Sequence, residues 1–250
     1  YSWLKPKLSK KIKSDAFFLT PPELASDITR VALSYLDSDE INFGDPSIGT
    51  GVFFASLLKN LNSKSLSSAI GIEVDPERAD TTLRRWYKKG LKVTNGDFLH
   101  LEDLPKRNLI IANPPYIRYQ DLKKEYANDL NERASVILND KVSGFSGLYV
   151  YFLILSHNWM EKDGVAAWLI PSGFMETDFG KAIRKYLTTN VTLLRLHKFD
   201  LDKAQFENAM VSSTVVIFKN KKPTTKELVE FSFGGSLLKP SKISKLSLTS

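Results

Sequence analysis

Through its middle, the chain alternates short apolar segments with longer segments of helical character. The segments expected to form strands are residues 41–45, 68–73, 91–94, 108–112, 165–170, 191–197 and 212–218. Those expected to form helices are residues 21–36, 52–61, 76–89, 148–161 and 174–187. Residues 108–112 (N-L-I-I-A) form a continuous, mainly apolar run, as in parallel strands that are buried on both faces. This alternation predicts an α/β domain with a mostly parallel sheet, helices on both of its faces and an antiparallel hairpin at its C-terminal edge.

Composition excludes several classes of protein. No run of about 18 uncharged apolar residues exists, so no membrane span is expected. The absence of cysteine removes disulfides, thiolate nucleophiles and cysteine-ligated zinc, and three widely spaced histidines predict no metal site. The chain opens at Tyr1 without a signal-like apolar segment, so we expect a cytoplasmic piece of something longer.

The positive charge lies at the two ends of the chain. The first thirteen residues hold five lysines and no acidic residue, and the chain from Lys219 onward holds seven lysines and two glutamates. Such ends either bind a polyanion or are solvated tails, and the sequence leaves both open. We expect a basic arm over residues 1–16, a main domain over 17–233 and a linker or tail over 234–250.

Acidic residues follow three of the expected strands, and ligands of such sheets bind beyond the carboxyl ends of the strands. Asp45 ends the first strand and leads into a turn that contains Gly49 and Gly51. Glycines let the backbone approach a ligand, but a tight strand-to-helix turn would use them as well. The turn lacks the third glycine of the dinucleotide fingerprint and the lysine of a P-loop, which disfavours pyrophosphate.

Glu73 ends the second strand, and Asp97 follows the third. A carboxylate accepts two hydrogen bonds, so Glu73 suits the two hydroxyls of a ribose, and Asp97 could accept from the amino group of an adenine. The alternatives are that Glu73 or Asp75 caps the next helix and that Asp97 makes an Asx turn. Together, the three strand ends predict a cleft for a nucleoside without phosphates.

The most specific motif is Asn113-Pro114-Pro115-Tyr116, directly after the expected strand 108–112. Two prolines forbid a helix and remove two backbone donors. The side-chain oxygen of Asn113 and nearby carbonyls then form an acceptor-rich edge beside an aromatic ring. This edge suits a planar amine that donates two N–H bonds and stacks on Tyr116, and a rigid turn is the alternative.

These motifs resemble those of S-adenosylmethionine-dependent methyltransferases that modify exocyclic amino groups. Residues 45–51 (D-P-S-I-G-T-G) precede 113–119 (N-P-P-Y-I-R-Y), and 17–25 (F-F-L-T-P-P-E-L-A) lie upstream of both. This order resembles the gamma class of DNA adenine-N6 methyltransferases, and 168–174 (W-L-I-P-S-G-F) resembles its restriction–modification members. The resemblance spans about residues 17–219. It implies a Rossmann-like class I methyltransferase fold, with 17–233 as the catalytic domain and 234–250 leading toward a target recognition domain.

The resemblance also implies which residues bind the cofactor, S-adenosylmethionine, whose product is S-adenosylhomocysteine. Many relatives carry Glu in place of Asp45. No metal is implied. Thr20 is also expected to cap the first helix. The implied residues are, at the methionine end, Thr20, Pro21, Pro22, Asp45, Gly49 and Gly51; at the ribose, Glu73; at the adenine, Ile72 or Val74, Asp97 and Phe98; and at the border with the substrate, Pro115 and Tyr116.

In the implied mechanism, the Asn113 side-chain oxygen and the Pro114 carbonyl each accept one N–H of a flipped-out adenine. This points the nitrogen lone pair at the methyl group, while Tyr116 and Phe206 stack on the base. Phe206 is alternatively a core residue at the start of a hairpin. The segment 118–146 would be partly helical and face DNA, or else be a solvated insertion. Its expected phosphate contacts are Arg118, Lys123 and Lys124.

The implied partner is double-stranded DNA, with a restriction endonuclease as a further domain or subunit and with no membrane. Such enzymes act in bacterial or archaeal cytoplasm, at the nucleoid. Two alternatives stay open. One is a methyltransferase for protein glutamine N5 or RNA guanine N2, because those amino groups pose the same geometric problem. The other is a non-catalytic nucleic-acid-binding scaffold.

Overall fold

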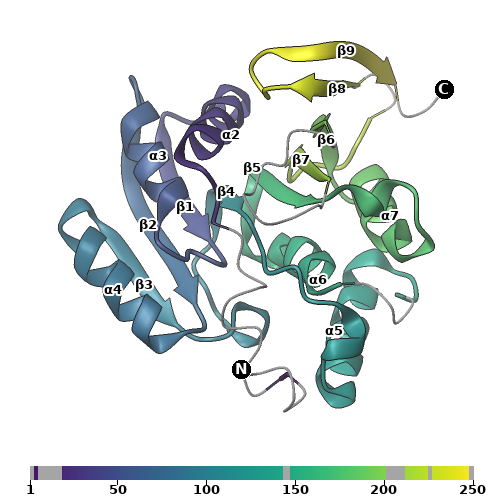
Figure 1. Ribbon diagram of the computed structural model, residues 1–250, viewed down its shortest axis with the longest axis horizontal. Helices are drawn as coiled ribbons and strands as arrows, with labels where there is room; N and C mark the ends of the chain where they lie inside the picture. Colours follow the sequence, from purple (N-terminus) through teal and green to yellow (C-terminus); the bar gives the residue numbers. More distant parts are fainter. Residues whose placement is uncertain (1–2, 5–18, 143–146, 201–211, 225–226, 248–250) are drawn as a thin grey trace.

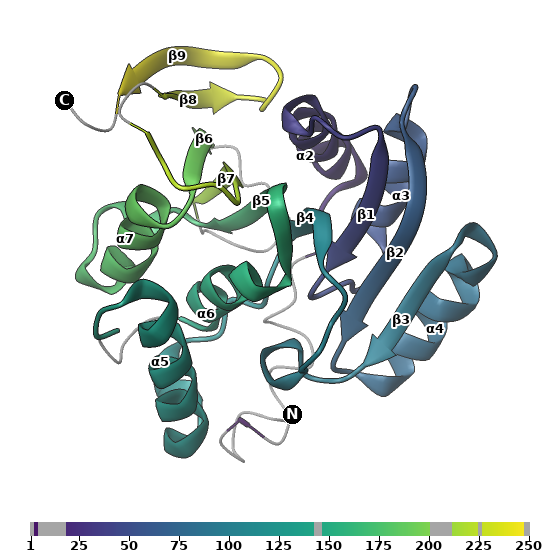
Figure 2. The same ribbon diagram turned by 180° about the vertical axis from the view of Figure 1, so that it is seen from behind.

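A nine-stranded sheet organises the computed structural model, which describes residues 3–4, 19–142, 147–200, 212–224 and 227–247 (Figures 1 and 2). Its strand order is β3-β2-β1-β4-β5-β7-β6-β8-β9. The strands are β1 (Glu40–Asp45), β2 (Ser65–Glu73), β3 (Leu91–Asn95), β4 (Arg107–Ala112), β5 (Met160–Pro171), β6 (Thr192–Lys198), β7 (Ser213–Lys219), β8 (Leu228–Gly235) and β9 (Pro240–Ser247).

The first five strands pair in parallel, so β1, β2, β3 and β4 all end at the same edge of the sheet. Strand β7 runs antiparallel between β5 and β6. Strands β8 and β9 form an antiparallel pair at the C-terminal edge. The predicted mostly parallel sheet with an antiparallel C-terminal hairpin is confirmed.

Helices cover both faces of this sheet (Figure 1). On strand β4, Leu109 and Ile111 pack in a core with α2 and α3, whereas Ile110 and Ala112 pack in a second core with α5 and α6. None of the described helices is long and apolar enough to cross a membrane. The helices are α2 (Pro22–Tyr35), α3 (Val52–Asn60), α4 (Pro76–Trp86), α5 (Lys124–Leu138), α6 (Leu148–Leu155) and α7 (Lys181–Thr189).

Two helices are shorter than the sequence predicted. The helix expected over 148–161 ends at Leu155, and strand β5 begins at Met160 because the backbone there pairs with β4. The helix expected over 174–187 begins only at Lys181. Gly180, the residue before α7, packs against the backbone of Phe174. The contact is so close that a Cβ atom on Gly180 would have no room.

The prediction of a linker or tail over 234–250 is wrong for residues 240–247. Pro240–Ser247 is strand β9, paired with β8 along its length. Side chains on both sides of this edge strand are exposed, so serines and lysines are tolerated there as they would be in a tail. The composition of this segment therefore did not indicate that it forms a strand.

Candidate active site

The turn after β1 brings backbone to the edge where the parallel strands end. Gly49 and Gly51 both have positive φ, of 52° and 81°, which glycine adopts without strain. A Cβ atom on Gly51 would lie 2.6 Å from Nε1 of Trp86, so α4 packs directly on this turn. Gly49 would meet only the Ser47 carbonyl oxygen, at 3.9 Å, so its backbone borders open space. The turn is therefore both packed and open to a ligand.

Asp45, at the end of β1, is almost completely buried. Its Oδ1 accepts a hydrogen bond of 2.9 Å from the backbone N–H of Ser47. Burial raises the pKa of this carboxyl to about 8, and the nearby Glu73 adds to the shift. At neutral pH Asp45 is therefore mainly protonated and can donate as well as accept a hydrogen bond.

Glu73, at the end of β2, ties the turn after β1 to its own strand. Its Oε2 accepts from the Gly49 N–H at 3.2 Å, and its Oε1 accepts from the Asp75 N–H at 3.0 Å. Burial raises its pKa, while these bonds and the Arg78 guanidinium, at 4.0 Å, oppose that rise. The helix cap is Asp75, which accepts from the Arg78 N–H, so of the two capping alternatives Asp75 is the correct one.

Asp97, after β3, makes the Asx turn that was the alternative to ligand binding. Its Oδ1 accepts from the Leu99 N–H at 3.1 Å. Its Oδ2 accepts from the Tyr126 hydroxyl at 2.8 Å and lies 3.2 Å from Nδ1 of His100. Asp97 also lines the pocket described next, so the Asx turn and the pocket share this residue.

One pocket collects side chains from three of these strand ends and from the motif after β4. The carboxyl groups of Glu73 and Asp97 lie with flat apolar groups, a set of hydrogen-bond acceptors and apolar surfaces that suits a ribose and an adenine. The space between the walls is about 30 Å³, which is smaller than an adenosyl group. The lining residues are Trp3, Pro46, Ser47, Ile72, Glu73, Val74, Gly96, Asp97, Phe98, Pro115 and Phe152.

Asn113 follows β4 and is tied on two sides. Its Nδ2 donates to Oγ1 of Thr20 at 3.1 Å, and its backbone carbonyl accepts from the Ser47 hydroxyl at 3.1 Å. The side chain of Asn113 is therefore oriented by Thr20, and its backbone by Ser47. The sequence predicted that Thr20 caps α2, and this prediction is wrong. Pro21 takes the cap position, without a side-chain hydrogen bond.

Tyr116 is held in place at both ends of its side chain. Its hydroxyl donates to the Leu169 carbonyl at 3.0 Å, and its ring meets the ring of Tyr149 edge-on at 6.3 Å. Burial raises the pKa of Tyr116. The preceding Pro114 and Pro115 are buried. Residues 113–118 form neither helix nor strand after β4, and this segment borders the pocket through Pro115.

Other predicted residues lie apart from this pocket or outside the described chain. Phe206 lies outside the described residues. Arg118, Lys123 and Lys124 are exposed, and Arg118 pairs with Asp121 at 3.2 Å. The segment that holds them is partly helical, as predicted, through α5.

Three aromatic residues at this site were missed by the sequence analysis: Trp3, Tyr126 and Phe152. Trp3 was assigned to the basic arm, yet it is buried and its ring stacks on Tyr126 at 5.5 Å. These residues lie in no local motif. Only the unbroken apolar run of α6 could have indicated that Phe152 is buried.

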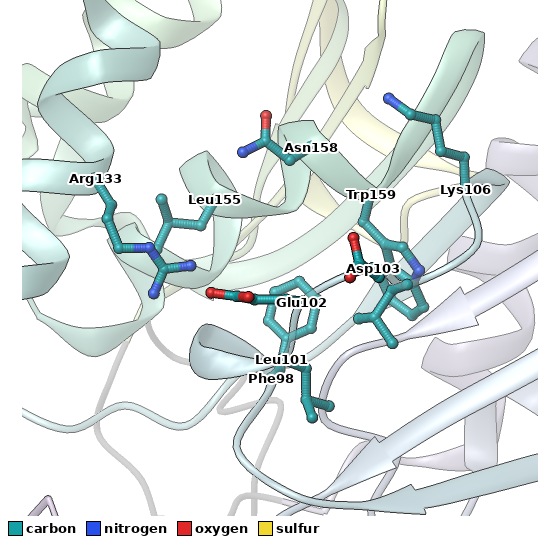
Figure 3. Close-up of a pocket in the computed structure, with 10 residues that line it drawn as sticks. Phe98, Leu101, Glu102, Asp103, Lys106, Arg133, Leu155, Asn158 and Trp159 are labelled. Atoms are coloured by element: carbon teal, nitrogen blue, oxygen red, sulfur yellow. The ribbon is translucent and has the colours of Figure 1, made fainter.

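A larger cavity, of about 450 Å³, shares Phe98 with this pocket (Figure 3). Its charged residues come from the chain between β3 and β4 and from α5, with Arg133 and Lys106 on different sides of the opening. Of the predicted residues that the structure describes, only Phe98 lines it. The motifs therefore converge on the smaller pocket, which we take as the candidate site.

Comparison with protein-family models matches residues 21–206 to the Eco57I restriction-modification methylase family. The Type II methyltransferase M.AccI of Acinetobacter calcoaceticus is 29% identical over 207 residues, which cover 81% of this chain and 36% of that protein. The chain spans about a third to a half of the length of the curated relatives that match more than four fifths of it.

Solved structures show the same fold. The methyltransferase subunit of a type I restriction-modification system from Streptococcus thermophilus has a TM-score of 0.69 at 17% identity, covering 90% of this chain and 49% of that one. The type IIG restriction endonuclease BpuSI has a TM-score of 0.71 at 16% identity, covering 93% and 31%. The architecture is therefore that of class I S-adenosylmethionine-dependent methyltransferases.

Proposed function

The chain belongs to the Eco57I restriction-modification methylase family, and from that premise we propose that it is the methyl-transferring part of a DNA adenine-N6 methyltransferase. The observation that carries the proposal is the position of Asn113. Its amide nitrogen is bound to Thr20 and its backbone carbonyl to Ser47, beside a pocket whose two carboxylates suit a nucleoside. M.AccI is by name a Type II methyltransferase, which supports DNA as the substrate.

S-Adenosylmethionine, when bound, supplies an activated methyl group on a sulfonium. Glu73 and Asp97 would hold its ribose and adenine amino group, with Ile72 and Phe98 against the adenine ring. Asp45 and the backbone of Gly49 would lie at its methionine end. The residues fit the group, because the acids stand at successive strand ends and the Gly49 backbone borders open space.

The protein's own part in the reaction is to make a poor nucleophile reactive. The lone pair of an exocyclic amine is delocalised into the base. The Asn113 Oδ1 and the Pro114 carbonyl would each accept one N–H, which draws the nitrogen toward a tetrahedral shape and directs its lone pair. The amine then loses one proton after attack, so no strong base is required at this site.

The target base must leave the duplex, at a cost of a few kcal/mol. Stacking on an aromatic ring is worth roughly 1–3 kcal/mol per base and offsets that cost. Tyr116 is suited to this role because its hydroxyl and ring edge are already fixed by Leu169 and Tyr149. Phe206 is proposed for the opposite face of the base. Arg118, Lys123 and Lys124 are proposed contacts to the DNA backbone.

Methyl transfer from labelled S-adenosylmethionine tests the proposal directly. The full-length protein is incubated in parallel with duplex DNA, with ribosomal RNA and with a peptide-release factor. We expect label on N6 of adenine in DNA, identified by nucleoside analysis. Label on glutamine or guanine instead would reassign the substrate, and no binding of the cofactor by calorimetry would leave only a nucleic-acid-binding scaffold.

The remainder of the full-length protein is proposed to read the target sequence, since this chain spans only a third to a half of its relatives. A restriction endonuclease, as a fused domain or a separate subunit, is the proposed functional partner. The likeness to BpuSI, by name a restriction endonuclease, supports the fused arrangement as one form.

A further inference from the structure

The carboxylate of Asp97 is almost fully engaged by the protein itself. A carboxylate offers about four acceptor positions on its two oxygens. Tyr126 and His100 approach Oδ2, at 2.8 and 3.2 Å, and the Leu99 N–H takes one position on Oδ1. One acceptor position, on Oδ1, is left for a ligand in the pocket that Asp97 lines.

Tyr126 is held against Asp97 by contacts from two distant parts of the sequence. Its ring lies 5.5 Å from that of Trp3, at an interplanar angle of 18°, and 4.9 Å from the ring of His100. The Trp3 carbonyl accepts from the Lys123 N–H at 2.9 Å, and Leu4 makes an antiparallel bridge with Leu122. The start of the chain is thus fastened to the segment that leads into α5.

His100 also lies close to an acidic residue of α5. Its Nε2 lies 3.2 Å from Oδ2 of Asp129, and the Arg133 guanidinium lies 3.5 Å from the same oxygen. Arg133 also donates to the Leu99 carbonyl, within the turn that Asp97 begins. Residues of α5 therefore fix both the carboxylate and the turn on which it stands.

We propose that Tyr126, supported by His100 and Trp3, is a positioning residue that makes the pocket select an adenine over a 6-oxopurine. The inference rests on the proposed function, because it concerns the cofactor of that reaction. With Oδ2 occupied, Oδ1 faces the purine. An amino group there donates to Oδ1, whereas a 6-oxo group would place a second acceptor against a carboxylate that cannot turn away.

The test compares binding of S-adenosylhomocysteine with that of its deaminated analogue, S-inosylhomocysteine, by calorimetry on the full-length protein. We expect the wild type to bind the adenine compound much more tightly. Tyr126→Phe keeps the ring stack but removes the bond to Asp97. The preference is the dissociation constant of S-inosylhomocysteine divided by that of S-adenosylhomocysteine. Tyr126→Phe should lower this ratio by about tenfold, the order expected for a hydrogen bond to a charged group.

Tyr151→Phe is the matched control. The Tyr151 hydroxyl donates to Oδ1 of Asn131 at 2.8 Å, so this variant loses a bond of equal length between α6 and α5 without touching Asp97. Its ratio should stay at the wild-type value. His100→Ala, at a partly exposed residue, is a second variant that should fold and should lower the ratio in the same direction.

An unchanged ratio in folded Tyr126→Phe and His100→Ala would overturn the positioning role, even if both compounds bind more weakly. Equal losses of affinity for the two compounds leave the ratio unchanged and therefore count as this outcome. Failure of the wild type to bind S-adenosylhomocysteine at all would instead count against the proposed function. The two failures are therefore distinguishable.

Discussion

Three carboxyl groups stand at three neighbouring strand ends, and their surroundings give each a different character. Asp45 is buried with a single backbone donor, and its pKa rises to about 8. Burial also raises the pKa of Glu73, but two backbone donors and Arg78 oppose that rise. Asp97 is held in a turn and by the Tyr126 hydroxyl. The same chemical group thus stands in three different hydrogen-bonding environments at one edge of the sheet.

Replacing Asn113 by alanine should abolish most methyl transfer while leaving cofactor affinity within about twofold, since Asn113 does not line the nucleoside pocket. Losing one preorganised acceptor should lower the rate by about 10²–10³, by analogy with oxyanion-hole donors. Single-turnover kinetics with labelled cofactor measures the rate, and calorimetry measures the affinity. Near-normal turnover would remove Asn113 from the mechanism.

Cofactor binding should release a proton at Asp45. The carboxyl is mostly protonated below pH 8 in the free protein, and a cationic methionine end would favour its ionised form. Affinity should therefore rise with pH up to about 8, by at most about tenfold per pH unit, and then level off. Calorimetry in buffers of different ionisation enthalpy reports the proton directly. Asp45→Asn should lose this proton release, and an unchanged release would contradict the assignment.

At the scale of elements, the turn between β1 and α3 depends on contacts that no other residue type permits. Gly51 is the N-cap of α3, with a φ of 81°, and lies against the indole of Trp86. That indole donates from Nε1 to the Thr50 carbonyl at 3.0 Å. The turn after β1 is thereby locked to α4, and the Gly49 N–H is locked to Glu73. The arrangement of the strand ends follows from these links.

Gly51→Ala should destabilise the protein more than Gly90→Ala does. Gly90 also has a positive φ, of 92°, but an added Cβ atom would lie in open space. Gly90→Ala should therefore cost only about 1–2 kcal/mol of backbone strain. At Gly51 the clash with Trp86 should add about 1–3 kcal/mol. Urea unfolding of both variants measures the difference. Equal losses would show that the turn can move away from α4.

At the scale of the whole molecule, one sheet joins the candidate site to strands β6 and β8, which contribute no residue to the lining of the pocket. His197, on β6, is fully buried, and its Nδ1 lies 2.9 Å from the Ser232 hydroxyl on β8. Its Nε2 has no hydrogen-bond partner among the described residues. Burial, with help from Arg195, lowers the pKa of His197 to about 4.

The folded protein should lose stability as the pH falls from 6.5 to 4, because the unfolded chain takes up a proton at His197 that the folded chain refuses. This residue should account for about 3 kcal/mol of the loss, at 1.36 kcal/mol for each pH unit. His197→Gln should show a shallower decline in the free energy of unfolding, measured with urea at both pH values. Parallel curves for variant and wild type would assign the decline to other groups.

Much of the fold and the candidate pocket could be predicted from local sequence, because local physics determines those features. Alternating apolar segments predicted seven strands, and each lies in the sheet within a few residues of its expected range. Glu73, Asp97, Phe98 and Pro115 line one pocket because parallel strands must end at a common edge. The prolines of the motif excluded a helix, and residues 113–118 form none.

Only the tertiary structure decided which residues complete the site and where two elements end. Trp3 and Tyr126 are 123 residues apart and meet because the chain start is bridged to the segment before α5. Strand β9 forms because the edge of β8 is available for pairing. The serines and lysines of β9 do not by themselves favour a strand. Such contacts join residues distant in sequence, and their energies depend on a packed partner that a local pattern does not contain.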